Sequence, residues 1–178
     1  MQRRHFLRRL GILALAGLGL PACARNEKAN ATSDEQGSSP IAKLSKPSSE
    51  WRQLLPPQAY TVLFEEATER PFSSPLNNEK RQGMFVCAAC YLPLFESSAK
   101  FDSGTGWPSF FQPLSGRIET KTDYKLILPR TEYHCVRCGG HQGHVFDDGP
   151  PPTGQRWCNN GVALNFVPAG EPLPALRT

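Results

Sequence analysis

Residues 141–164 read HQGHVFDDGPPPTGQRWCNNGVAL, and they gather more reactive side chains than any other part of the chain. Two histidines three residues apart lead into an acidic, Pro/Gly-rich bend. Beyond the bend come Arg156, Cys158 and Asn160, whose side chains point to the same face if this segment is an extended strand. We therefore expect these residues to form a site, with the rest of the chain building a pocket around it.

Cys158 is the candidate catalytic thiol, because it stands outside any CxxC pair. A lone cysteine is most often a small buried hydrophobe, and a single histidine is most often a core or metal-supporting residue. A nucleophilic cysteine must ionise, however, and a neighbouring Arg or His lowers its pKa. Arg156 is two residues away, and His141 or His144 could donate a proton from the adjoining segment. The combination favours a catalytic role.

Two CxxC pairs lie far apart in the chain and predict one structural zinc. The four candidate ligands are Cys87, Cys90, Cys135 and Cys138. Each CxxC turn lets two thiolates converge, so two turns supply a tetrahedral set. Two alternatives remain open: disulfides or a redox-active CxxC, and a local Cys2His2 site that combines the second pair with His141 and His144.

A mainly β domain is predicted from residue 83 onward, where short apolar or alternating runs are separated by Gly/Pro turns. The expected strands are Met84–Cys87, Leu92–Phe95, Arg117–Thr122, Tyr124–Leu128, Thr131–Cys135, His144–Phe146 and Val162–Val167. No helix-length apolar period occurs in this part, so we expect an antiparallel arrangement.

Two short helices are expected before the strands. One runs through Trp51–Leu55, with Ser48 or Ser49 as its N-cap. The other carries apolar residues at helical spacing through Ala59–Leu63 and ends before Pro71. They carry no candidate chemistry, and we expect them to brace the β domain.

The loop KFDSGTGWPSFF, residues 100–111, places Trp107 at a glycine-rich bend next to Thr105. The indole is either part of the core or one wall of a small-molecule pocket. A rigid indole face packs well against methyl and sulfur groups.

A signal peptide is predicted at residues 1–22, where a basic start leads into an apolar run too short to span a bilayer. Arg3-Arg4 resembles a twin-arginine export signal. Leu20–Cys23 resembles a lipoprotein processing site, which makes Cys23 a candidate lipidation residue. We expect acyl groups on Cys23 to anchor the protein to a membrane. Plain secretion, with Cys23 incidental, is the alternative. Either way we expect export to the periplasmic side of a bacterial envelope.

The remaining chain divides into a flexible tether at 23–49, a domain at 50–170 and a C-terminal tail at 171–178. The tether is polar and has few apolar residues to bury. The formal charge of +4 comes from four arginines in the signal peptide, since the rest carries 16 Lys and Arg against 16 Asp and Glu. A neutral domain argues against a nucleic-acid partner. Nothing indicates an oligomer, so we expect a monomer.

The order of motifs closely resembles the methionine-R-sulfoxide reductases of the B type. The matching segments are TERPFSSPLN, KFDSGTGWPSF, both CxxC pairs, RTE and the 141–164 stretch, and the likeness runs from Trp51 to Phe166. The resemblance implies two antiparallel β-sheets, a zinc held by the four CxxC cysteines, and reduction of methionine-R-sulfoxide in peptides or proteins.

The resemblance also implies roles for individual residues. Cys158 would attack the sulfoxide sulfur and become a sulfenic acid. The residues expected to shape the site and handle the oxygen are His141, His144, Arg156 and Asn160. The substrate-binding residues are expected to be Thr105, Trp107, Phe146 and Asp148, with Trp107 packing on the substrate methyl group.

The chain departs from the family pattern in three places, one of which is Trp157, where other aromatic residues or histidine are common. Thr105 stands where many members carry a resolving cysteine, so we expect no intramolecular disulfide and reduction of the sulfenic acid by an external thiol or reductase. Gln142 replaces the usual leucine between the histidines and is expected to alter the pocket rim. Two other function classes remain as alternatives: an inactive zinc-bearing lipoprotein and a general disulfide oxidoreductase.

Overall fold

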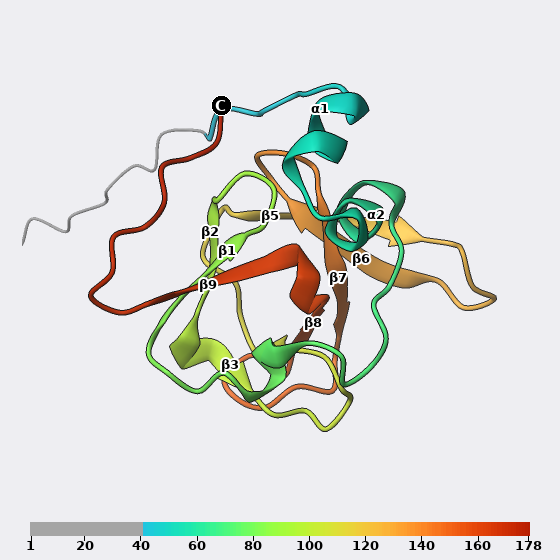
Figure 1. Cartoon of the computed structure of the whole chain (residues 1–178). Coiled ribbons are helices and arrows are strands. Elements are labelled where there is room, and N and C mark those ends of the chain that lie inside the picture. The colour runs from blue at the N-terminus through green and yellow to red at the C-terminus, as the bar shows by residue number, and fades with distance from the viewer. Residues whose placement is uncertain (1–40) are drawn as a thin grey trace, which may run out of the picture. The chain divides into compact units, whose positions relative to one another are not determined.

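The computed structural model describes residues 41–178, which form two antiparallel β-sheets preceded by two short helices (Figure 1). The helices are α1 (Ser48–Leu54) and α2 (Pro57–Glu65). The smaller sheet has the order β2-β1-β9, made of β1 (Gly83–Cys87), β2 (Pro93–Glu96) and β9 (Leu164–Pro168). The larger sheet has the order β3-β4-β8-β7-β6-β5, made of β3 (Lys100–Phe101), β4 (Ser109–Phe110), β5 (Ile118–Asp123), β6 (Arg130–Cys135), β7 (His141–Phe146) and β8 (Arg156–Asn159). The predicted class, mainly β with two antiparallel sheets and short N-terminal helices, is confirmed.

The core is built largely from aromatic rings contributed by both sheets. Phe95 stacks on Phe110 with 4.2 Å between ring centroids, and Tyr133 meets Trp157 edge-on at 5.0 Å. Fully burying one large apolar side chain contributes roughly 1.5–3 kcal/mol before entropic costs. Because side chains alternate along a strand, burying Trp157 in this core directs its neighbour Cys158 to the other face of the sheet.

The helices brace the sheets as expected, but their ends differ from the prediction. The N-cap of α1 is Pro47, and no side chain caps the helix, because Ser48 is already its first residue. Helix α2 ends at Glu65 and is followed by Glu66, whose φ of 53° is left-handed, so the helix stops well before Pro71. Stacking of Trp51 on Phe64, with centroids 5.0 Å apart, joins the two helices.

The ordered domain begins earlier than residue 50. Ile41 and Leu44 pack against the core, and the backbone N–H of Leu44 donates to the carbonyl of Arg137 at 2.6 Å. The last part of the predicted tether is therefore docked on the domain, because its two large aliphatic residues find apolar partners. The C-terminal tail is also docked, since the N–H of Arg177 donates to the carbonyl of Cys90 at 3.1 Å.

The predicted strand at Tyr124–Leu128 is wrong, because these residues form the turn between β5 and β6. Asp123 ends β5 and accepts a hydrogen bond from the backbone N–H of Lys125 at 2.8 Å, a local contact that favours a turn over a further strand residue. The alternating apolar residues that suggested a strand are exposed on the turn instead.

Within residues 41–178, neither helix has the length and apolar character needed to cross a bilayer. The predicted signal peptide at 1–22, the candidate lipidation residue Cys23 and the first part of the tether lie outside the described residues.

Candidate active site and zinc centre

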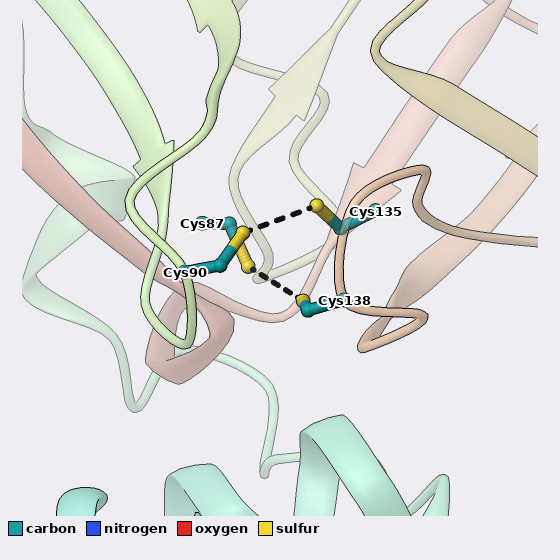
Figure 2. Close-up of side chains that lie close together, drawn as sticks. All are labelled: Cys87, Cys90, Cys135 and Cys138. Atoms are coloured by element: carbon teal, nitrogen blue, oxygen red, sulfur yellow. Dashed lines mark hydrogen bonds between the residues drawn. The ribbon is translucent and has the colours of Figure 1, made fainter. Parts of the chain in front are cut away.

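The four CxxC cysteines converge on one point, as Figure 2 shows. Cys87 Sγ lies 3.7 Å from Cys138 Sγ, and Cys90 Sγ lies 3.5 Å from Cys135 Sγ, with all four sulfurs within 4.8 Å of one another. A tetrahedral zinc with Zn–S bonds of about 2.3 Å requires sulfurs about 3.8 Å apart, so the set fits one zinc ion. The predicted structural zinc is borne out.

The chemistry of the cluster also calls for a cation. Hydrogen bonds with the sulfurs of Cys135, Cys138 and Cys90, together with burial, raise the pKa of the Cys87 thiol well above its ordinary value. Four thiols packed together in this way do not all ionise unless a positive charge offsets their repulsion. The sulfur separations are too long for disulfides, whose S–S bond is about 2.05 Å.

Both CxxC turns are held by the same backbone contacts. The N–H of Cys87 donates to the carbonyl of Leu92 at 2.8 Å, and the N–H of Cys135 donates to that of Gly140 at 3.0 Å. The residue after each second cysteine, Tyr91 or Gly139, has a left-handed φ of 63° or 70°. A glycine adopts that conformation without strain, which explains Gly139 in the second turn.

Strands β7 and β8 bring the candidate catalytic residues together. In their antiparallel register His144 lies opposite Cys158, and Phe146 lies opposite Arg156, so these four side chains share one face of the sheet. A pocket of about 110 Å³ opens on this face, and Trp107, Asn160 and Thr68 are also among its lining residues. The open question about Trp107 is answered, since its indole forms part of the pocket wall.

The surroundings of the Cys158 thiol oppose its ionisation, whereas the sequence predicted a lowered pKa. Burial raises its pKa above the ordinary value, and it outweighs the positive charge of Arg156 and the hydroxyl of Thr105, which both act to lower it. Free of substrate, Cys158 is therefore mainly a thiol at neutral pH. Thr105 lies close enough to this sulfur for its hydroxyl to act on the thiol.

Arg156 is held in place by two partners. Its guanidinium makes a bidentate pair with Asp148 at 2.8 and 2.9 Å and lies over the ring of Phe146, 4.4 Å from the centroid. The pair lowers the pKa of Asp148. These contacts fix the guanidinium near Cys158 and connect Asp148 and Phe146 to it.

His144 is oriented by an acid that the sequence analysis did not identify. Its Nε2 lies 2.8 Å from Asp123 Oδ2, which also accepts from Arg130 at 2.6 Å. A hydrogen bond from the Lys125 backbone, helped by His144 and Arg130, lowers the pKa of Asp123 well below its ordinary value, so this carboxylate only accepts. Burial lowers the pKa of His144. A neutral His144 therefore carries its hydrogen on Nε2 and keeps Nδ1 as a base.

His141 lies behind His144 and is not among the residues lining the pocket of Cys158. The two rings meet edge-on with centroids 5.5 Å apart, and His141 Nδ1 lies 2.6 Å from Glu132 Oε1. A β-bulge at Gln142, where Tyr133 pairs with Gly143 and His134 pairs with His141, brings the two histidine rings together. A regular strand would direct side chains three residues apart to opposite faces.

Since both histidines are engaged with carboxylates away from the sulfur cluster, the Cys2His2 alternative is wrong.

Asn160 follows the last residue of β8, Asn159, and lines the pocket of Cys158. Its Oδ1 accepts from the N–H of Glu69 at 3.0 Å, and its Nδ2 donates to the carbonyl of Gln142 at 3.0 Å. The amide is thus committed to holding the pocket together. Gln142 itself is fully buried, so the expectation that it alters the pocket rim is wrong.

Glu69 is a second residue that sequence reasoning left without a role, although it lies in the TERPF segment. Its carboxylate is buried and accepts from the N–H groups of Gly161 and Val162 at 2.5 and 3.1 Å. Its carbonyl accepts from the indole N–H of Trp107 at 3.2 Å. Glu69 thereby ties the Trp107 wall to the chain that follows Cys158. Burial raises its pKa, against the lowering effect of the two backbone donors.

Comparison with known proteins agrees with this geometry. The SelR domain family matches residues 55–168. The chain is 52% identical over 131 residues to a protein of Pseudomonas putida (strain W619), covering 72% of this chain and 97% of that one. It is 49% identical over 127 residues to a protein of Agrobacterium fabrum, a match that covers 71% of this chain and 94% of the relative. It is 51% identical over 122 residues to a protein of Methanosarcina barkeri, a match that covers 68% of this chain and 86% of the relative. All three are named peptide methionine sulfoxide reductase MsrB. Matches of this extent place the chain in one family, and it belongs to the SelR domain family.

Proposed function

We propose that this protein is an oxidoreductase that reduces methionine-R-sulfoxide in peptides or proteins to methionine. The observation that carries the proposal is the pairing of Cys158 with His144 across β7 and β8, at the floor of a small pocket walled by Trp107. The relatives' name, peptide methionine sulfoxide reductase, supports the same substrate class.

The pocket suits a methionine sulfoxide side chain and can distinguish its two epimers. Trp107 and Phe146 offer apolar surface to the methyl group and methylenes. His144 offers a polar group for the oxygen. With the sulfur facing Cys158, only one epimer directs its methyl group to the indole and its oxygen to the imidazole. The family resemblance assigns that epimer as R.

The resting protonation states define the first step. Neutral His144 takes the proton of the Cys158 thiol, directly or through water, and the thiolate attacks the electrophilic sulfur. The imidazolium then returns the proton to the sulfoxide oxygen, and Arg156 stabilises negative charge on the Cys158 sulfur. The oxygen passes to Cys158, which becomes a sulfenic acid. The substrate sulfur is reduced by two electrons, the cysteine sulfur is oxidised by two, and methionine leaves.

Regeneration of Cys158 requires an external reductant. One thiol condenses with the sulfenic acid, releasing water and leaving a mixed disulfide, and a second thiol releases Cys158 and the oxidised reductant. The other four cysteines of residues 41–178 form the zinc cluster. A small thiol or a thioredoxin-like protein matches the chemistry.

Turnover of the two sulfoxide epimers tests the proposal. The purified protein with dithiothreitol should consume the R epimer of N-acetyl-methionine sulfoxide and leave the S epimer, and Cys158→Ser should abolish the reaction. A structural lipoprotein would reduce neither epimer. A general disulfide oxidoreductase would keep its insulin-reducing activity in the Cys158→Ser variant.

We further propose that the protein is exported through the twin-arginine pathway and held at the periplasmic side of a bacterial envelope by acylated Cys23, acting there as a monomer. The support is the basic and apolar pattern of residues 1–22 and the Leu20–Cys23 segment. In a strain lacking the twin-arginine translocase the protein should stay in the cytoplasm. Cys23→Ala should release the exported protein from the membrane fraction, and normal export in the first strain would refute the pathway.

A further inference from the structure

The turn between β5 and β6, residues 124–129, displays large apolar side chains to solvent. Ile127 is fully exposed, and Tyr124 and Leu128 are 75% and 76% exposed. In Figure 1 this turn extends outward from the larger sheet. Side chains in this position contribute nothing to the core, and contiguous exposed apolar groups of this kind mark interaction sites. We call residues 124–129 the apolar turn.

A groove of about 700 Å³ runs from the apolar turn toward the catalytic pocket. The turn residues Leu126–Pro129 form one side of it, and Val145 and Phe146 of β7 contribute to its lining. Phe146 and Arg130 line both the groove and the pocket of Cys158, so the two cavities share a boundary. The positive charge of Arg130 is offset by Asp123, 2.6 Å away, and Asp147 is the other charged residue of a lining that is mainly apolar.

The base of the apolar turn is anchored to the catalytic machinery. Asp123 accepts from Lys125 at the start of the turn and from Arg130 just after it, and the same carboxylate holds His144. Glu66 adds an ion pair with Lys125 at 2.6 Å. The turn is therefore presented in a fixed orientation relative to the pocket, which lowers the entropic cost of binding a chain there.

A second exposed aromatic residue borders the Trp107 wall. Phe72 is 73% exposed and has a left-handed φ of 63°, which is unusual for a large side chain. Its N–H donates to the carbonyl of Gly106 at 2.7 Å, and its ring lies so close to Gly106 that a Cβ there would come within 2.9 Å of it. The rim of the pocket thus carries apolar surface beside Trp107 as well as beside Phe146.

We propose that the apolar turn and its groove bind the polypeptide that flanks methionine sulfoxide, and so favour substrates with large apolar residues next to the oxidised methionine. This inference rests on the proposed function. When a methionine sulfoxide side chain occupies the pocket, its backbone must cross the rim, and an extended chain advances about 3.3 Å per residue. The nearest flanking side chains then reach the groove that borders Phe146. A polypeptide fits this surface because the groove continues into the site that takes its oxidised residue.

The test compares three substrates with dithiothreitol as reductant: N-acetyl-methionine-R-sulfoxide, a pentapeptide with leucine and phenylalanine flanking the sulfoxide, and the same peptide with serines. The combined variant Ile127→Ser, Leu128→Ser should raise the KM for the apolar peptide on the order of tenfold, with kcat unchanged. The KM and kcat for the other two substrates should not change. The matched control Leu173→Ser, Leu176→Ser removes leucines that are 47% and 44% exposed elsewhere and should change none of the three.

Two results would overturn the proposal. The first is an equal change, or no change, for all three substrates in the turn variant. The second is an unchanged apolar-peptide KM together with loss of binding to anionic phospholipid vesicles, which would assign the turn to a lipid surface. Failure of the unaltered protein to reduce N-acetyl-methionine-R-sulfoxide would instead refute the proposed function itself, before any variant is compared.

Discussion

Gln142 Nε2 lies 3.5 Å from Cys87 Sγ, and both side chains are completely buried. The other end of the same amide, Oε1, accepts from Asn159 Nδ2 at 3.4 Å. Asn159 directly follows Cys158 in β8. A single side chain therefore connects a zinc ligand to the strand that carries the candidate nucleophile. An N–H group directed at a ligand sulfur stabilises the negative charge of the thiolate, as outer hydrogen bonds do in other metal sites.

Replacing this amide should weaken the zinc site more than it weakens the fold. Gln142→Leu keeps the side-chain volume but removes the donor to Cys87, and we expect zinc transfer to a colorimetric chelator to accelerate about tenfold. Far-UV circular dichroism should be unchanged, because Asn159 Nδ2 retains the carbonyl of Asn160 at 2.8 Å. Gln112→Leu alters an exposed glutamine and serves as the control. Zinc transfer at the unaltered rate in Gln142→Leu would contradict the assignment.

Gln142 also shows where sequence reasoning reached its limit. The CxxC spacing and the short alternating runs predicted the zinc and the mainly β class, and strand alternation placed Arg156 and Cys158 on one face. These features depend on local geometry. The bulge at Gln142 depends on how β7 pairs with β6, and it alone brings His141 next to His144 and buries Gln142.

The carboxylates of the site were missed for the same reason. Asp123 and Glu132 lie on β5 and β6, and only the pairing of β5, β6 and β7 places them beside His144 and His141. In the sequence they read as solvated charges of ordinary strands. Glu132 falls in the RTE segment that carries the family likeness, and that was the available signal for it.

Glu132 should give the protein a pH-dependent part of its stability. Although burial opposes ionisation, hydrogen bonds from His134 and His141 lower the pKa of this carboxyl to about 2. Its folded-state pKa is below the unfolded value near 4.3, so its contribution is fully present above about pH 4.3 and is lost as the pH falls toward about 2. Glu132→Gln should therefore be roughly 2 kcal/mol less stable at pH 6.5, and the difference should shrink at pH 3.

Urea unfolding of both proteins at the two pH values measures this effect. Because thiolate ligands bind zinc less tightly as the pH falls, only the difference between the two proteins is informative. Glu119→Gln removes a carboxylate whose side chain is 43% exposed and whose Oε2 lies 3.5 Å from His134 Nε2. This control should change stability far less. A stability difference that is equal at pH 6.5 and pH 3 would show that the charge of Glu132 is not responsible.

The Cys158 thiol should titrate above the ordinary cysteine range in the absence of substrate, because burial raises its pKa. The rate of alkylation by iodoacetamide, followed at this residue by mass spectrometry, should rise with a midpoint above about 8.5. Arg156→Gln removes the positive charge that opposes the increase, so the midpoint should move still higher. Arg156→Lys keeps the charge and should leave it closer to that of the unaltered protein. A midpoint at or below neutral pH would mean that Cys158 is a preformed thiolate.

In the proposed mechanism, Thr105 leaves oxidised Cys158 without a thiol at this position. Its hydroxyl lies beside the Cys158 sulfur and acts to lower the pKa of that thiol, and Ser103 Oγ, 2.8 Å away, holds it in place. A thiol introduced by Thr105→Cys would stand within reach of the sulfenic acid formed on Cys158. After a single turnover without reductant, we expect the unaltered protein to form a dimedone adduct at Cys158 and the variant to form an intramolecular disulfide instead. Thr105→Ser, which keeps the hydroxyl, should behave like the unaltered protein.

If Thr105→Cys and the unaltered protein give equal dimedone labelling, position 105 is not close enough to resolve the oxidised cysteine. If the unaltered protein links Cys158 to any of the four zinc ligands, regeneration does not depend on an external thiol alone.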